Sequence, residues 1–64
     1  MTKKEIKQIA IGLLKEGWVE TDDNKYYISE LKECDSCDLE NLLSEIESNS
    51  TLNGDMIQDL IDNL

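Results

Sequence analysis

The amino-acid sequence predicts a small, mainly α-helical bundle of three or four helices. Three observations support this fold class: apolar residues recur at helical spacing in three segments, the 64-residue chain contains no proline, and only one Trp and two Tyr are aromatic. A chain of this length forms one domain, residues 1–64, with a small core. The alternative fold class is α+β, with a β-hairpin at about residues 18–29.

The first helix is predicted over about residues 3–16. Thr2, followed three residues later by Glu5, has the pattern of a capping box, in which each side chain bonds the other residue's backbone N–H. Five apolar residues then recur on one face: Ile6, Ile9, Ala10, Leu13 and Leu14. This face predicts the side of the helix that enters the core.

Two glycines belong to this first segment. Gly17 suits the left-handed position after a helix, which predicts that Trp18 folds back towards Leu13. Gly12 lies inside the helix, where glycine costs about 1 kcal/mol relative to alanine. Close packing against another helix is the expected compensation for that cost.

The segment from residue 18 to residue 29 has two interpretations. Trp18 to Thr21 and Tyr26 to Ser29 are rich in strand-forming residues and flank a short polar stretch, which is typical of a hairpin. An ordered loop pinned by the same apolar residues fits equally well. The first helix and a hairpin here also look like the end of a winged-helix module, although the negative charge argues against DNA binding.

The second half of the chain predicts two more helices. One begins at about Ser36 or Cys37, with Asp35 or Ser36 as its N-cap, and ends in a polar linker over residues 48–51. Its apolar face consists of Leu39, Leu42, Leu43 and Ile46. The last helix covers about residues 54–63, with a predicted buried stripe of Leu52, Met56, Ile57, Leu60, Ile61 and Leu64.

Charge is distributed very unevenly. The chain carries six Lys, no Arg or His, and fifteen Asp plus Glu, which gives a net charge of -9. Lys32 is the last cation, and every charge after it is negative. Direct nucleic-acid binding is therefore not expected, and partners of the second half should present basic surfaces. The carboxylates expected to contact such partners are Glu40, Glu45, Glu47, Asp55, Asp59 and Asp62, of which the last three form one ridge along the last helix.

The residue types exclude most catalytic and metal chemistry. Without His, neither Ser nor Cys has the usual base that activates a nucleophile, so no enzymatic activity is expected. Cys34 and Cys37 have CxxC spacing, but two ligands are half of a zinc site and the surrounding carboxylates disfavour a reactive thiolate. No metal site is predicted. In the absence of a signal peptide or an apolar run that could cross a membrane, a cytoplasmic location and reduced thiols are expected.

One stretch carries a more specific pattern. Asp35-Ser36-Cys37-Asp38 opens a segment that continues through alternating acidic and aliphatic residues to Glu47. This stretch resembles the acyl carrier protein signature, in which Asp-Ser-Leu-Asp begins a helix. The order of parts is also similar, because a capped first helix, a connection of about twenty residues, the serine and a closing helix follow one another. Cys37 departs from the family's leucine, and the linker at 48–53 is too short for the family's small third helix.

The resemblance implies a function for Ser36. In that family the serine hydroxyl carries 4′-phosphopantetheine, whose thiol holds acyl groups as thioesters, so the implied attachment site is Ser36 with Asp35 and Asp38 beside it. The implied partners are a phosphopantetheinyl transferase and acyl-handling enzymes that dock on the acidic helix. Such a carrier needs no catalytic residue of its own.

A second function fits the same charges. A small acidic inhibitor, such as a phage-type mimic of nucleic acid, presents carboxylates in place of phosphates to the basic groove of a target protein. Ser36 would then be an ordinary helix cap. The sequence leaves open the acyl group and pathway, the target of any inhibitor, the oligomeric state and the roles of the two cysteines.

Overall fold

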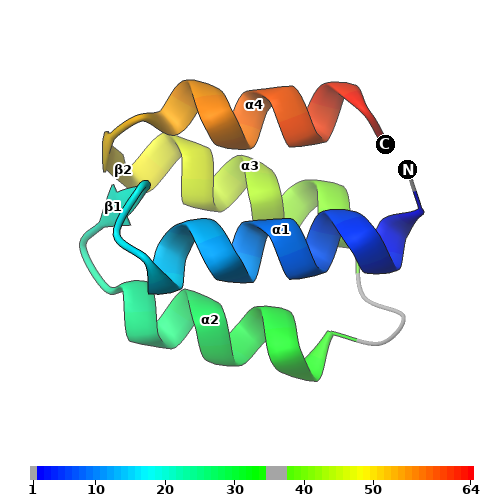
Figure 1. Ribbon diagram of the computed structural model, residues 1–64, viewed down its shortest axis with the longest axis horizontal. Coiled ribbons are helices and arrows are strands. Elements are labelled where there is room, and N and C mark those ends of the chain that lie inside the picture. The colour runs from blue at the N-terminus through cyan, green and yellow to red at the C-terminus, as the bar shows by residue number, and fades with distance from the viewer. Residues whose placement is uncertain (1, 35–37) are drawn as a thin grey trace.

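The computed structural model describes residues 2–34 and 38–64, and it confirms the mainly α-helical fold. The structure has four helices, α1 (Lys3–Lys15), α2 (Asn24–Glu33), α3 (Leu39–Asn49) and α4 (Gly54–Asp62). The short strand β1 (Glu20–Thr21) lies between α1 and α2, and β2 (Ser50–Leu52) lies between α3 and α4. Figure 1 shows that successive helices alternate in direction, with α1 lying between α2 and α4 and with α3 behind it. The two strands close one end of the bundle, and both chain termini lie at the other end (Figure 1).

Helix α1 confirms the first predicted helix and its cap. The backbone N–H of Glu5 donates to Thr2 Oγ1 at 3.2 Å, and the N–H of Thr2 donates to Glu5 Oε1 at 3.1 Å. The bond from the Thr2 N–H, and then the one that the Thr2 hydroxyl donates to the same Oε1 at 3.1 Å, lower the pKa of the Glu5 carboxyl. Gly17 ends the helix region with a φ of 80°, the left-handed conformation that its sequence position predicted.

The apolar face of α1 is rotated from the one that the sequence predicted. Ile6, Ala10 and Leu14 are buried as expected, but Ile11 is also buried, Leu13 is only partly covered and Ile9 is exposed. Trp18 does not fold into the core; Val19 does so instead, and its N–H donates to the Leu13 carbonyl at 3.2 Å. The predicted close packing at Gly12 is also wrong, because a Cβ built there meets no atom within 4 Å.

Neither the hairpin nor the loop predicted for residues 18–29 is correct. Residues from Asn24 onward form α2, whose N-cap Asp23 accepts a hydrogen bond from the N–H of Tyr26 at 3.1 Å. Tyr27 and Leu31, one helical turn apart, enter the core beside α1, and this burial outweighs the strand preference of the tyrosines. Strand β1 pairs instead with β2, antiparallel, with Glu20 opposite Leu52.

Asn24 fixes the connection between α1 and α2. Its side-chain N–H groups donate to the carbonyls of Leu14 at 3.1 Å and Val19 at 3.0 Å, and its Oδ1 accepts from the N–H and the hydroxyl of Thr21. One side chain thus satisfies backbone groups at the end of α1 and beside β1. These bonds hold the chain where it reverses direction between α1 and α2. A hairpin turn is not needed for this reversal.

Helix α3 begins later than predicted. Its N-cap is Asp38, which accepts a hydrogen bond from the N–H of Asn41 at 3.2 Å, so the prediction of Asp35 or Ser36 as the cap is wrong. The helix ends at Asn49, so the first two residues of the predicted linker, Ser48 and Asn49, are helical and the next two belong to β2. Helix α4 confirms the last predicted helix, but Leu52 and Leu64, expected in its buried stripe, are exposed.

The core draws on all four helices. The largest fully buried side chains are Ile6, Val19, Leu31, Leu43, Ile46 and Ile57. Helix α1 packs mainly against α2, and α3 packs mainly against α4, whereas α1 and α4 touch less extensively. Because α1 and α4 pack less closely, the apolar residues along the seam between them are only partly buried.

Candidate functional site

The structure describes the residues on either side of the predicted attachment site but not the attachment site itself. Ser36 and Asp35 lie outside the described residues, as does Cys37. On one edge, the Nζ of Lys7 donates to the carbonyl of Cys34 at 2.8 Å and so caps the carboxyl end of α2. Cys34 itself is buried and belongs to a disulfide bond, so the expectation of a reduced thiol at this position is wrong.

On the other edge, Asp38 is exposed at the start of α3. Its Oδ1 caps the helix, and its Oδ2 accepts from the Asn41 side chain at 2.7 Å. Beside it lies a shallow open depression of about 300 Å³, lined by Glu30, Glu33, Cys34, Asp38 and Leu42. Three carboxylates line this depression, which makes it unfavourable for a phosphate group. Among residues 2–34 and 38–64, no cluster of carboxylates and cysteines is arranged to hold a metal ion.

The acidic residues predicted on α3 divide between two sides of the helix. Glu40 and Glu47, seven residues apart, share one side, and the Glu47 carbonyl lies near Gly54 at the start of α4. Glu45 lies on the other side, near Tyr26 of α2. The structure therefore does not bring these three carboxylates together into one site.

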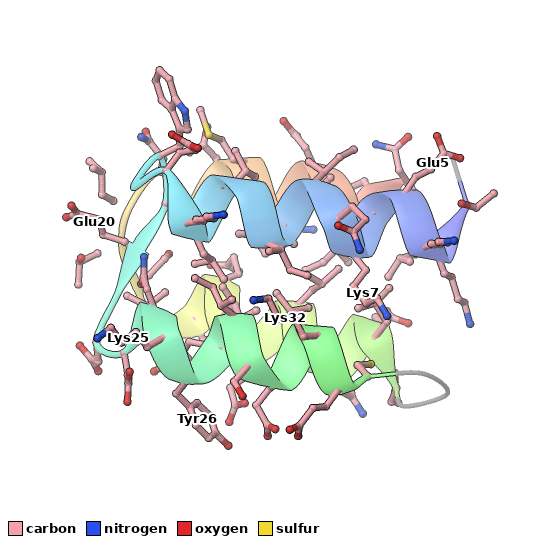
Figure 2. The ribbon with its side chains drawn as sticks, turned by 60° about the horizontal axis from the view of Figure 1, so that its bottom comes forward. Glu5, Lys7, Glu20, Lys25, Tyr26 and Lys32 are labelled. Atoms are coloured by element: carbon pink, nitrogen blue, oxygen red, sulfur yellow. The ribbon has the colours of Figure 1, made fainter. Side chains whose placement is uncertain are left out.

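Tyr26 marks the acidic surface between α2 and α3. Its hydroxyl donates to Glu30 Oε1 at 3.0 Å, and Figure 2 shows its ring directed outward from α2. The hydrogen bond and the charge of Glu30, then desolvation, and then the charge of Glu45 raise the pKa of the Tyr26 hydroxyl above its ordinary value. The neighbouring Tyr27 is buried, and its hydroxyl accepts from the Asn49 side chain at 2.6 Å.

The three aspartates predicted as a ridge are exposed on α4. Asp55, Asp59 and Asp62 lie on the side opposite the buried Ile57 and Leu60. We call these three residues the acidic ridge. No Lys or Arg occurs after Lys32, so the second half of the chain offers no cation that could neutralise the ridge.

The sequence interpretation missed a set of exposed apolar side chains. Ile9 is 40% exposed, Leu52 46% and Trp18 59%, although each was expected in or against the core. The Asn53 side chain donates to the Trp18 carbonyl at 2.8 Å, which brings Trp18 close to Leu52, the residue before Asn53. The predicted apolar faces contain more residues than so small a core can cover. This surplus is the feature of the sequence that indicates exposed apolar side chains.

Comparison with known proteins gives no relative: no protein-family model, curated protein or solved structure matches this chain. Within the described part of the chain, every helix is too short or too polar to span a membrane. The exposed charges and apolar side chains described above are therefore the features that indicate a function.

Proposed function

We propose that this chain is a small acidic interaction protein that binds a basic surface of a target protein, such as a nucleic-acid-binding groove. The observation that supports the proposal best is the acidic ridge, because all three aspartates are exposed along one side of α4 with no compensating cation after Lys32. Carboxylates in such a row attract the same cationic side chains that contact phosphates. A protein that acts in this way needs no catalysis of its own.

The position of Asp62 is consistent with selection for binding rather than for stability. Asp62 is the last residue of α4, where a negative charge lies next to the negative end of the helix dipole, and the last turn contains no basic residue. The side chain of Gln58 donates to Asp62 Oδ1 at 3.1 Å, but this exposed contact does not neutralise the charge. An unfavourable charge kept at this end of the ridge supports a role for it in recognition.

The test is capture of a partner by two doubly neutralised variants. In the first, Asp55→Asn and Asp59→Asn remove two charges of the ridge; in the second, Asp22→Asn and Glu33→Gln remove two exposed charges elsewhere. Both variants have the same net charge. Tagged forms of these proteins and the parent chain are used to capture partners from a cell extract, and a captured protein is identified and purified.

The purified partner then decides the proposal. We expect affinity for the ridge variant to fall between about twofold and thirtyfold, since each exposed ion pair contributes about 0.2–1 kcal/mol. Affinity for the control variant should change little, binding should weaken with salt, and a DNA duplex should compete. Equal loss in both variants, or no loss in either, contradicts a role for the ridge.

A second candidate function is the carrier suggested by the resemblance to acyl carrier proteins. The exposed Asp38 and Glu40 at the start of α3 support it, because acidic residues in the family's corresponding helix dock partner enzymes. Two findings weigh against it: α2 occupies what would be the family's long connection, and α3 begins at Leu39 rather than at Ser36.

The carrier function is tested by direct loading. The protein is incubated with coenzyme A and a broad-specificity phosphopantetheinyl transferase, and its mass is measured before and after. One added 4′-phosphopantetheine on the parent chain, and none on Ser36→Ala, would support the carrier over the inhibitor. No addition with several such transferases would leave the acidic interaction protein as the remaining function.

A further inference from the structure

Three exposed apolar residues, Ile9, Trp18 and Leu52, and two partly buried ones, Leu13 and Met56, lie along the seam between α1 and α4. We define the apolar strip as Ile9, Leu13, Trp18, Leu52 and Met56. Trp18 and Leu52 are placed together by the bond from Asn53 to the Trp18 carbonyl and by the pairing of Glu20 with Leu52. Met56 lies one turn into α4, where its N–H donates to the Asn53 carbonyl at 3.0 Å.

The orientation of α1 places Ile9 and Leu13 on the same side. Lys7 reaches the end of α2, and Figure 2 shows it on the side of α1 that faces α2, with Glu5 on the opposite side. Ile9 lies two residues after Lys7, about 200° around the helix, and therefore away from α2. Because α1 lies between α2 and α4, Ile9 and Leu13 border α4 (Figure 1).

Carboxylates border this strip on both helices. Glu5 of α1 lies four residues before Ile9, and Glu16, which follows the last residue of α1, lies seven residues after it. Glu20 of β1 lies opposite Leu52. On α4, Asp59 lies one turn after Met56 and belongs to the acidic ridge. All of these carboxylate residues are exposed. The strip is thus apolar along its centre and negatively charged along both margins.

We infer that the apolar strip binds an amphipathic helix of the target protein, with apolar residues along one side and Lys or Arg on both flanks. This inference rests on the proposed function and specifies the chemistry of the partner. An apolar row between two cationic rows complements the strip and its margins, as in helix-in-groove recognition of basic amphipathic helices. A second copy of this chain fits poorly, because each copy carries a net charge of -9 and would bring further carboxylates to the same margins.

Trp18 provides a direct assay because it is the only tryptophan in the chain. The probe is a synthetic 18-residue helix of Leu and Lys with the leucines on one face, and the control peptide has the same composition with the leucines spread around the helix. We expect the amphipathic helix to shift Trp18 emission to shorter wavelengths, since the indole leaves water. The control peptide should bind more weakly and shift the emission less.

Three variants localise the binding. Ile9→Ser and Leu52→Ser each remove an exposed apolar side chain of the strip, and Tyr26→Ser removes one that is 52% exposed on α2, outside the strip. We expect Ile9→Ser and Leu52→Ser each to weaken binding of the amphipathic helix at least about fivefold, and Tyr26→Ser to leave it unchanged. Circular dichroism of each variant verifies that the helices are intact before binding is measured.

The outcomes separate this inference from the proposed function. If both peptides bind equally and neither Ile9→Ser nor Leu52→Ser changes binding, the apolar strip is not the binding site and this inference is refuted. The proposed acidic binding surface would remain. Absence of any shift in Trp18 emission would also refute the inference. The proposed function would still be tested separately, by binding of the ridge variant to the partner captured from the cell extract. Self-association of the chain that Leu52→Ser abolishes would assign the strip to a second copy and refute the inference.

Discussion

Replacing Gly12 by alanine tests whether the outer side of α1 is open in the free protein. A Cβ built on Gly12 meets no atom within 4 Å, and its backbone is helical, with its carbonyl accepting from the Glu16 N–H at 2.9 Å. The methyl group therefore neither clashes nor loses a hydrogen bond. What remains is the difference in helix propensity, which favours alanine by about 0.5–1 kcal/mol.

The expected result is a more stable protein. For a domain of this size, that gain raises Tm by roughly 2–8 °C. Urea unfolding followed by circular dichroism measures the free energy, and an unchanged m-value shows that the unfolded state exposes the same surface. Thermal unfolding at several protein concentrations verifies that the gain is not produced by association.

Gly17→Ala is the matched control. A Cβ there also meets no atom within 4 Å, but Gly17 has a φ of 80°, which costs a residue with a side chain about 1–2 kcal/mol. The two substitutions add the same methyl group into open space, yet their effects should have opposite signs. Destabilisation by Gly12→Ala would refute the reasoning, because it would require a close neighbour at Gly12 in the folded protein.

Three further predictions concern charged and titratable groups. Asp62→Asn should raise the free energy of unfolding by a few tenths of a kcal/mol in urea melts, because it removes a negative charge from the carboxyl end of α4. The lowered pKa of Glu5 stabilises the folded state above pH 4.5, its ordinary pKa, and this gain disappears as the pH falls through the lowered value. Glu5→Gln should therefore lower Tm near neutral pH and have less effect in acid; a constant difference would contradict this. Glu30→Gln should lower the raised pKa of Tyr26 towards 10, measured by phenolate absorbance, and an unchanged titration would exclude Glu30 as its main cause.

Part of the candidate site could be predicted from the spacing of residues within single helices. The acidic ridge could be predicted because residues four and seven apart share a helix side and α4 forms as its apolar pattern indicates. The apolar strip could not be predicted in the same way. Whether Ile9 and Leu52 are covered depends on how closely α4 lies against α1, and no local pattern contains that distance.

The sequence by itself determined the features that depend on neighbouring residues. The Thr2 and Glu5 capping box, the left-handed Gly17, the last helix and the excess of negative charge after Lys32 all follow from short-range geometry and composition. Only the tertiary structure decided that residues 24–33 are helical, since Tyr27 and Leu31 gain their burial beside α1. It also decided that β1 pairs with β2 across the molecule, because contacts between residues so distant in sequence form only when the helices have packed.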